Sequence, residues 1–209
     1  MKEKVLLPYA ILGNTTWFAH YLQFPEVVVE LNEHFVKQSY RSRSTILGAN
    51  GPLDLIVPIE HGRAERVPMK NVRIAYHHDW QREQWQSLVS AYRASPYFEY
   101  FERDVEPVWF EKHEKLVDRS RALLELSLAL MHEKVRHSVS NSYEKDPRST
   151  DRREAIHPKK RWPLAEYYPI YTQVFEDRHP FTPDLSVFDL LFNLGPDASK
   201  YLRNLKLEA

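Results

Sequence analysis

The pattern of apolar positions in the first thirty residues predicts a strand, a short helix and a second strand. Residues 5–7 are apolar, and Asn14 or Thr15 can cap a helix that ends before Pro25. Residues 27–31 are β-branched and apolar, as in a buried strand. A strand–helix–strand unit favours two parallel strands with the helix packed on one face.

A hairpin is predicted directly after this unit. The segment 34–46 leads into Asn50 and Gly51, a pair that supplies the positive φ angles of a tight turn. Beyond the turn, apolar and polar residues alternate over 53–59, with Ile56 as the exception, which is the period of a half-buried strand. The unit and the hairpin together predict a mixed sheet in the N-terminal half.

The C-terminal half is expected to be mainly helical. Asp79 can cap a helix that Pro96 ends, and residues 113–135 carry the strongest helical stripe of the chain. A further helix is predicted to start at Thr182, and a last short one to span 197–205. These elements together indicate an α/β or α+β fold.

Length and charge narrow the class of protein. We expect residues 1–209 to form one domain, because this length is ample for a buried core. The chain has 29 Lys and Arg against 29 Asp and Glu, so its formal net charge is zero, which makes nucleic acid an unexpected partner. The absence of cysteine excludes disulfides and thiolate chemistry. No apolar run of about 18 residues exists for a transmembrane segment, so we expect a cytoplasmic protein.

The first candidate for ligand chemistry is a cluster of cations before the turn. If this segment is extended, Arg41 and Arg43 point to the same face, with Lys37 in the same period and Tyr40 on the opposite one. Two guanidiniums side by side suit a phosphate, a pyrophosphate or a carboxylate. The alternative is a solvated strand edge whose arginines pair with surface carboxylates.

The second candidate is segment 136–165, where the apolar signal almost vanishes. A loop of about 30 residues without secondary structure is uncommon in a compact domain unless it is functional or disordered. It can close over an anionic ligand, or it can be a mobile surface insert. Tyr143 and Trp162 lie too far apart in sequence for a nucleic-acid stacking platform. The segment has an excess of four positive charges, and its cations are Arg136, Lys145, Arg148, Arg152, Arg153, Lys159, Lys160 and Arg161.

Other chemistry finds little support in the sequence. His77 and His78 are consecutive, and His132 and His137 are five residues apart, so neither pair has the spacing of a helical metal site. Glycine-rich phosphate loops and the nucleophile elbow of hydrolases are missing. With only 5 glycines, the chain must hold a phosphate mainly by side chains. We expect no metal and no cofactor, and the histidine spacing selects no general base.

Five blocks of the sequence, in order along the chain, resemble the WbqC-like protein family. Ser42 departs from the pattern, because an asparagine is usual between the two arginines. The matching blocks read KQSYRSRSTILGANG at 37–51, SAYRASPYFEY at 90–100, DRREAIHPK at 151–159, YPIYTQVF at 168–175 and FTPDLSVFDLLFNLGP at 181–196.

The resemblance implies a transferase role in the biosynthesis of surface polysaccharides of the O-antigen type. It carries over no catalytic residues, so these stay unknown. We hypothesise that the chain binds an anionic substrate, such as a nucleotide-sugar, between the arginine segment and the basic loop. Asp189 or a histidine would serve as base. The residues predicted to bind substrate are Lys37, Tyr40, Arg41, Arg43, Arg152, Lys159 and Asp189.

A rival hypothesis is a non-catalytic binding or scaffold protein with an exposed aromatic surface at residues 97–101 and Trp109. Convergence of Arg41, Arg43, Arg152 and Lys159 on one cleft would favour the enzyme, and scatter of these cations would count against it. The oligomeric state stays open.

Overall fold

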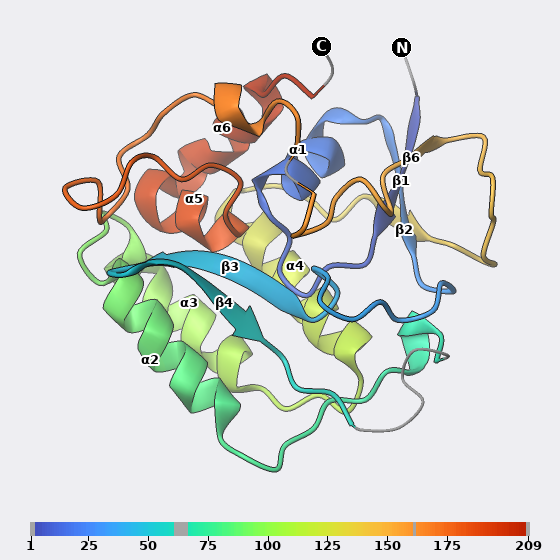
Figure 1. The fold of residues 1–209 in the computed structure, drawn as a ribbon, viewed down its shortest axis with the longest axis horizontal. Coiled ribbons are helices and arrows are strands. Elements are labelled where there is room, and N and C mark those ends of the chain that lie inside the picture. Colours follow the sequence, from blue (N-terminus) through green and yellow to red (C-terminus); the bar gives the residue numbers. More distant parts are fainter. Residues whose placement is uncertain (1–2, 61–66, 161, 208–209) are drawn as a thin grey trace.

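Two separate β-sheets and six α-helices make up the described part of the computed structural model, which covers residues 3–60, 67–160 and 162–207 (Figure 1). The larger sheet is parallel, with the strand order β5-β2-β1-β6. The smaller one is an antiparallel hairpin of β3 and β4. The strands are β1 (Lys4–Pro8), β2 (Glu26–Glu30), β3 (Arg43–Gly48), β4 (Gly51–Ile56), β5 (His137–Val139) and β6 (Thr150–Asp151).

The helices follow the hairpin except for the first. The α-helices are α1 (Thr15–Gln23), α2 (Trp80–Tyr92), α3 (Phe98–Phe110), α4 (Leu116–Leu130), α5 (Val187–Leu194) and α6 (Ala198–Asn204). Short 3-10 turns occur at η2 (Met69–Asn71), η3 (Ala165–Tyr167) and η4 (Gly195–Asp197). This arrangement confirms the mixed α/β class with a helical C-terminal half. Within the described residues, none of these helices combines the length and the apolar character needed to cross a membrane.

The predicted strand–helix–strand unit is confirmed. β1 and β2 pair in parallel, with Val5 opposite Val27 and Leu7 opposite Val29. The Asn14 side chain accepts the backbone N–H of Trp17 at 3.0 Å, so it caps α1 as predicted. The alternating strand register and this cap are both local properties, which explains why the sequence pattern indicates them.

The hairpin is also confirmed, and Gly51 adopts the left-handed φ of +106° that its turn requires. It forms a sheet of its own, so the prediction that it joins β1 and β2 in one mixed sheet is wrong. The segment before α5 lies along β3, where the carbonyl of Thr45 accepts the backbone N–H of Ser186 at 2.8 Å. The Tyr92 hydroxyl at the end of α2 accepts the N–H of Leu47 at 3.3 Å. The hairpin therefore lies against helices α2 and α5.

The prediction that helix α5 starts at Thr182 is wrong. The helix begins at Val187, and Asp184 before it has a left-handed φ of +63°. The Asp184 carboxylate instead accepts the backbone N–H of Thr16 and the side-chain amide of Asn14, both at 2.8 Å. A carboxylate at this place satisfies free N–H groups in the first turn of α1, so the segment before α5 serves the start of another helix.

Helix α3 divides the aromatic residues of the rival hypothesis into a buried and a more exposed set. Phe98 and Trp109 are buried with exposed fractions of at most 2%, and the Trp109 indole N–H donates to the carbonyl of Gln81 at 3.1 Å. Tyr97 and Phe101 are half-buried, Tyr100 is 76% exposed, and the ring of Tyr97 contacts both of the others. The surface predicted at residues 97–101 and Trp109 is therefore reduced to these three rings.

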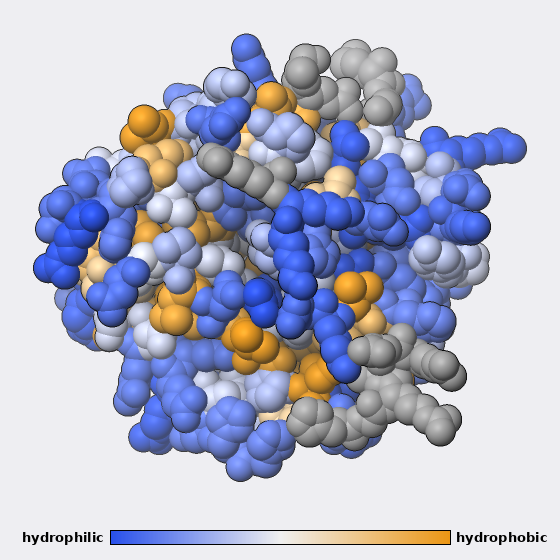
Figure 2. All heavy atoms as spheres, viewed as in Figure 1, coloured by the Kyte–Doolittle hydropathy of each residue, from blue (hydrophilic) through white to orange (hydrophobic). Residues whose placement is uncertain are grey.

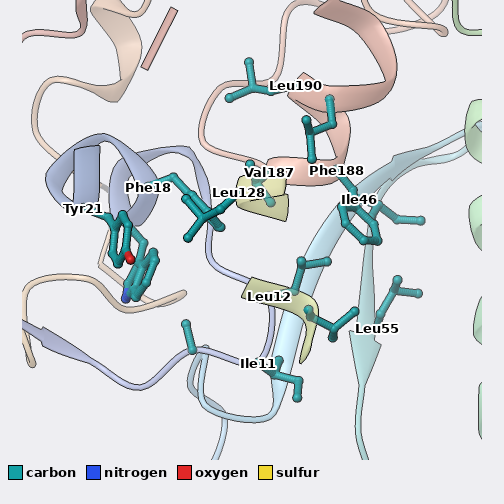
Figure 3. Packing of buried hydrophobic residues seen from close by; sticks show 14 of the residues in the cluster. Ile11, Leu12, Phe18, Tyr21, Ile46, Leu55, Leu128, Val187, Phe188 and Leu190 are labelled. Carbon is teal, nitrogen blue, oxygen red and sulfur yellow. The ribbon is translucent and has the colours of Figure 1, made fainter. Parts of the chain in front are cut away.

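The core lies between the hairpin and the helices α1, α4 and α5. Figure 3 shows side chains from these elements pointing toward one another, with Ile46 of β3 beside Phe188 of α5 and Phe18 of α1 beside Leu128 of α4. All four are at most 1% exposed. This packing fixes the segments that join the hairpin to the parallel sheet, and thereby the loops at the sheet's edge.

Candidate functional site

The main candidate site is a pocket of about 910 Å³ at the carboxyl ends of the parallel strands. In an open parallel sheet this edge is where ligands bind, because the loops that leave the strands converge there. Figure 1 shows the connection between β5 and β6 projecting from this part of the sheet. The pocket is lined by Asn32, Glu33, His34 and Val36 after β2, Tyr143, Lys145 and Asp146 after β5, Asp151, Arg153, Glu154, His157, Lys159 and Lys160 at and after β6, and Arg41 before β3.

Arg153 forms the centre of the pocket floor. Its side chain is only 5% exposed and donates from Nη2 to Asp151 Oδ2 at 2.7 Å and from Nη1 to Glu30 Oε2 at 3.3 Å. Glu30 is fully buried and also accepts the Ser140 hydroxyl and the N–H of Asn32. One guanidinium therefore ties the ends of β2 and β6 together, and Glu30 links them to the end of β5.

A second buried ion pair adjoins the first. Arg41 donates from Nε and Nη2 to the two carboxylate oxygens of Glu33, at 2.8 and 2.6 Å, with the residue 3% exposed. Its Nη2 also contacts the carbonyl of Arg153 at 3.5 Å. Burial raises the pKa of Glu33, although the Arg41 guanidinium opposes that effect. We call Glu30, Glu33, Arg41, Asp151 and Arg153 the pocket-floor cluster.

This cluster contains three carboxylates and two guanidiniums, and Arg153 is shared by Glu30 and Asp151. Burial alone would raise the pKa of Asp151, but hydrogen bonds and charge from Arg153 outweigh it and lower that pKa. Each guanidinium already has a carboxylate within 2.7 Å, so neither offers a free charge to a ligand. The cluster fixes the shape of the pocket floor, and removal of one partner would leave an unpaired buried charge.

The accessible charges lie at the rim. Lys145, Lys159 and Lys160 are exposed, and Lys160 lies 4.0 Å from Glu154. Among the described residues, Lys145 and Lys159 have no ion pair. Lysines of this kind are compact, mobile charges that suit a phosphate.

His157 adds a fixed polar group beside these lysines. Burial lowers its pKa, and so do the charges of Arg41, Lys160 and Lys159, which means that the field at the ring is positive. The backbone N–H of Lys159 donates to Nδ1 at 3.1 Å. With Nδ1 accepting, the neutral ring carries its proton on Nε2, so it presents a hydrogen-bond donor.

The structure separates the predicted cations. Arg41 and Lys159 line the 910 Å³ pocket, whereas Lys37 and Arg43 line a different cavity of about 360 Å³. The reason is local: β3 begins only at Arg43, and the preceding segment turns, with a left-handed φ of +53° at Gln38. The alternation that would place both arginines on one face therefore starts too late to include Arg41.

This second cavity is bounded by the hairpin. Arg43 pairs there with Asp54 at 2.9 Å. Figure 2 shows hydrophobic side chains interrupting a largely hydrophilic face where β4 ends, and Leu53 and Ile56 of this strand are 42% and 48% exposed. Its walls are mainly apolar and include Phe35, Ile56, Val57, Pro58 and Ile59.

Arg152 lies on the other side of the sheet from the pocket. Side chains alternate along a strand, so Asp151 and Arg153 face the pocket and Arg152 faces away. Its Nε donates to Nε2 of the buried His20 at 3.0 Å, and its guanidinium lies 5.2 Å from the ring centre of Trp162. Arg161, counted in the basic segment, is outside the described residues.

The two remaining predicted residues belong to the interior. Tyr40 is half-buried, and burial raises the pKa of its hydroxyl. Asp189 is 1% exposed and accepts hydrogen bonds from the hydroxyls of Tyr92 and Tyr171 and from the Gln173 amide. Burial raises the pKa of Asp189. We call these four residues of the core the Asp189 cluster: Asp189, Tyr92, Tyr171 and Gln173.

Sequence reasoning missed most of the pocket. Glu30 carries a usable signal, because it ends an apolar strand at its carboxyl end, where a charge is out of place unless it serves a site. Arg153 was counted among the cations of the basic segment, but its bond to Glu30 spans 123 residues and has no local signal. Glu33 pairs with Arg41 only eight residues away, yet both lie outside regular elements, so no periodic pattern indicates the pair. Strands β5 and β6, of 3 and 2 residues, are too short and polar to interrupt the pattern of a loop.

Comparison with known families places the pocket inside a matched region. The model of the WbqC-like protein family matches residues 14–161. All residues that line the 910 Å³ pocket fall within these bounds, whereas Asp189 does not. Neither the curated proteins nor the solved structures contain a match to this chain.

Proposed function

Because the chain belongs to the WbqC-like protein family, we propose that it binds an anionic, phosphate-bearing substrate of surface-polysaccharide assembly in the pocket at the carboxyl ends of the parallel strands. The pocket-floor cluster carries this proposal, because its buried, paired side chains build a rigid base whose arginines are fully occupied, beneath a rim of lysines. Pockets of about 300–1,000 Å³ hold drug-sized ligands, and this one, at about 910 Å³, has room for a nucleotide-sugar.

The charges of the pocket support an anionic ligand once the internal pairs are set aside. Glu33 and Asp151 are bound by arginines, and Glu154 lies near Lys160. At the rim, Lys145 and Lys159 then outnumber the remaining carboxylate, Asp146, while the buried Glu30 is a third carboxylate for the two arginines of the floor. The Nε2–H of His157 would donate to a phosphate oxygen held between these lysines.

Transfer chemistry is the finer part of the proposal and rests on the family. The four predicted cations do not converge on one cleft, so that argument for an enzyme is lost. His157 is not set up as a general base, since its Nδ1 already accepts a hydrogen bond. A coupled assay for nucleoside diphosphate released from a nucleotide-sugar tests transfer independently of binding.

Binding can be measured by calorimetry with inorganic pyrophosphate and with a panel of nucleotide-sugars. The double variant Lys145→Gln/Lys159→Gln should bind pyrophosphate about tenfold or more weakly, because each charged hydrogen bond contributes about 1.5–3 kcal/mol. Lys200→Gln is the matched control, as this lysine is exposed on α6 away from the pocket. Wild-type protein that binds none of these probes, or a double variant that binds like Lys200→Gln, would overturn the proposal.

A further inference from the structure

Tyr143 is the aromatic side chain of the pocket lining, and it lies in the connection between β5 and β6. The residue is 53% exposed, although a tyrosine usually buries much of its area. The Arg153 guanidinium lies over one face at 4.7 Å from the ring centre. Arg153 thus covers one face of a ring that lines the pocket, and the exposure of the residue leaves room for a ligand on the other face.

The contact beneath Tyr143 is unusually well fixed. Arg153 is held by Asp151 and Glu30, and its Nη2 also donates to the carbonyl of Glu144 at 2.8 Å. The same guanidinium therefore supports the ring of Tyr143 and restrains the backbone of the next residue. An exposed aromatic ring that is held in place in this way loses little conformational freedom when a ligand stacks on it.

We infer that Tyr143 is the platform on which the base of a nucleoside diphosphate stacks, with the diphosphate held by the rim lysines Lys145 and Lys159; this inference rests on the proposed function. The covered face favours a base over a sugar ring. A cation on one face of an aromatic ring attracts the ring's π electrons, so the opposite face becomes less negative and binds the C–H groups of a sugar more weakly. A flat, polarisable base does not depend on that negative charge and stacks on any aromatic face.

The size of the pocket agrees with a ligand larger than a simple anion. A volume of about 910 Å³ far exceeds what a phosphate group occupies, so the lysine rim and Tyr143 can contact different parts of one molecule. Stacking would supply affinity without reading the identity of the base, because all bases present a flat face. The platform would then distinguish nucleotides from other phosphates rather than one nucleotide from another.

The test compares three probes on three variants by calorimetry. The probes are uridine 5′-diphosphate, glucose 1-phosphate and inorganic pyrophosphate. Tyr143→Leu should bind uridine 5′-diphosphate about fivefold to a hundredfold more weakly, the range measured for loss of one stacked base. Its affinity for the other two probes should stay that of the wild type. Tyr143→Phe should retain nucleotide binding, and Tyr100→Leu, at a tyrosine of α3 that is also more than half exposed, should change nothing.

The outcomes separate the inference from the proposed function. If Tyr143→Leu binds uridine 5′-diphosphate as the wild type does, or loses pyrophosphate to the same extent, the platform is overturned while the pocket stands. An equal loss of glucose 1-phosphate would place a sugar on the ring and also overturn it. If the wild type binds neither pyrophosphate nor the nucleotide, both proposals fall.

Discussion

The pocket-floor cluster and the Asp189 cluster are both buried and polar, but they differ in charge and in position. The first contains carboxylates and guanidiniums in near balance and borders a large pocket. The second has one carboxylate, that of Asp189 on α5, which accepts hydrogen bonds from two hydroxyls and an amide inside the core. Burial of a polar group alone therefore does not mark a site, whereas burial at the edge of a cavity on the carboxyl side of a sheet does.

Of the variants that test the difference between the two clusters, Arg41→Met should lower the free energy of unfolding most. It leaves Glu33 buried without its cation, and loss of one partner from a buried pair costs about 3–5 kcal/mol. Urea unfolding should show this loss in the free energy of unfolding. Arg73→Met, in a pair that is half exposed on both sides with Glu60, should change the midpoint far less.

The double variant Arg41→Met/Glu33→Leu sharpens the same measurement. Removing both charges should restore most of the stability, because an apolar pair of similar volume carries no desolvation penalty. A single variant as stable as wild type would show that the pair is not buried in solution. Arg41→Ala is for the same reason a poor probe of ligand binding, because loss of folded protein would mask any change in affinity.

Asp189→Asn should have an intermediate effect, and on stability alone. The new amide places a donor opposite the donors of Tyr92, Tyr171 or Gln173, and an unsatisfied buried polar group costs about 1–3 kcal/mol. Pyrophosphate binding by the folded variant should equal that of the wild type. If the folded variant bound pyrophosphate more weakly, Asp189 would contribute to ligand binding, and the two clusters would not differ in function.

The smallest expected effect concerns the titration of His157. Its pKa in the free protein should lie below the ordinary 6.5, because burial and nearby cations disfavour the charged ring. A base whose folded pKa is lowered contributes stability that is present above pH 6.5 and lost as the pH falls through that lower pKa. Histidine signals in NMR spectra recorded against pH give the value directly.

Pyrophosphate should raise this pKa by roughly one unit, because a nearby anion favours the imidazolium. The exposed His78, outside the pocket lining, is the internal control, and its NMR signals should not move when pyrophosphate is added at constant pH. If the pKa of His157 were the same with and without pyrophosphate, the anion would not lie beside this ring.

Local patterns in the sequence were sufficient for the β1–α1–β2 unit, the hairpin and helices α2 and α4. Each depends on neighbours within a few residues, such as the Asn14 cap or the turn at Gly51. The start of α5 was not predictable in this way, because the Asp184 carboxylate accepts the N–H of Thr16, which is 168 residues away. Long-range partners override local preference at such positions.

The site was predictable only in outline. The sequence identified Arg41 and Lys159 as ligand candidates, and both line the pocket. It grouped Arg152 with them, although a shift of one residue along β6 turns that side chain to the opposite face of the sheet. Composition cannot show which arginine of an adjacent pair faces a cavity, because both have the same charge and the same neighbours.

The connectivity of the parallel sheet has a consequence for how the domain folds. β1 and β2 are joined through α1 alone, so their pairing needs only a short stretch of chain. The partner of Val5 on the other edge is Thr150, and Arg153 meets Glu30 across 123 residues of sequence. Contacts over such separations close slowly. The pocket is thus among the last parts of the domain to assemble, and a folding chain stays unable to bind until β6 has joined the sheet.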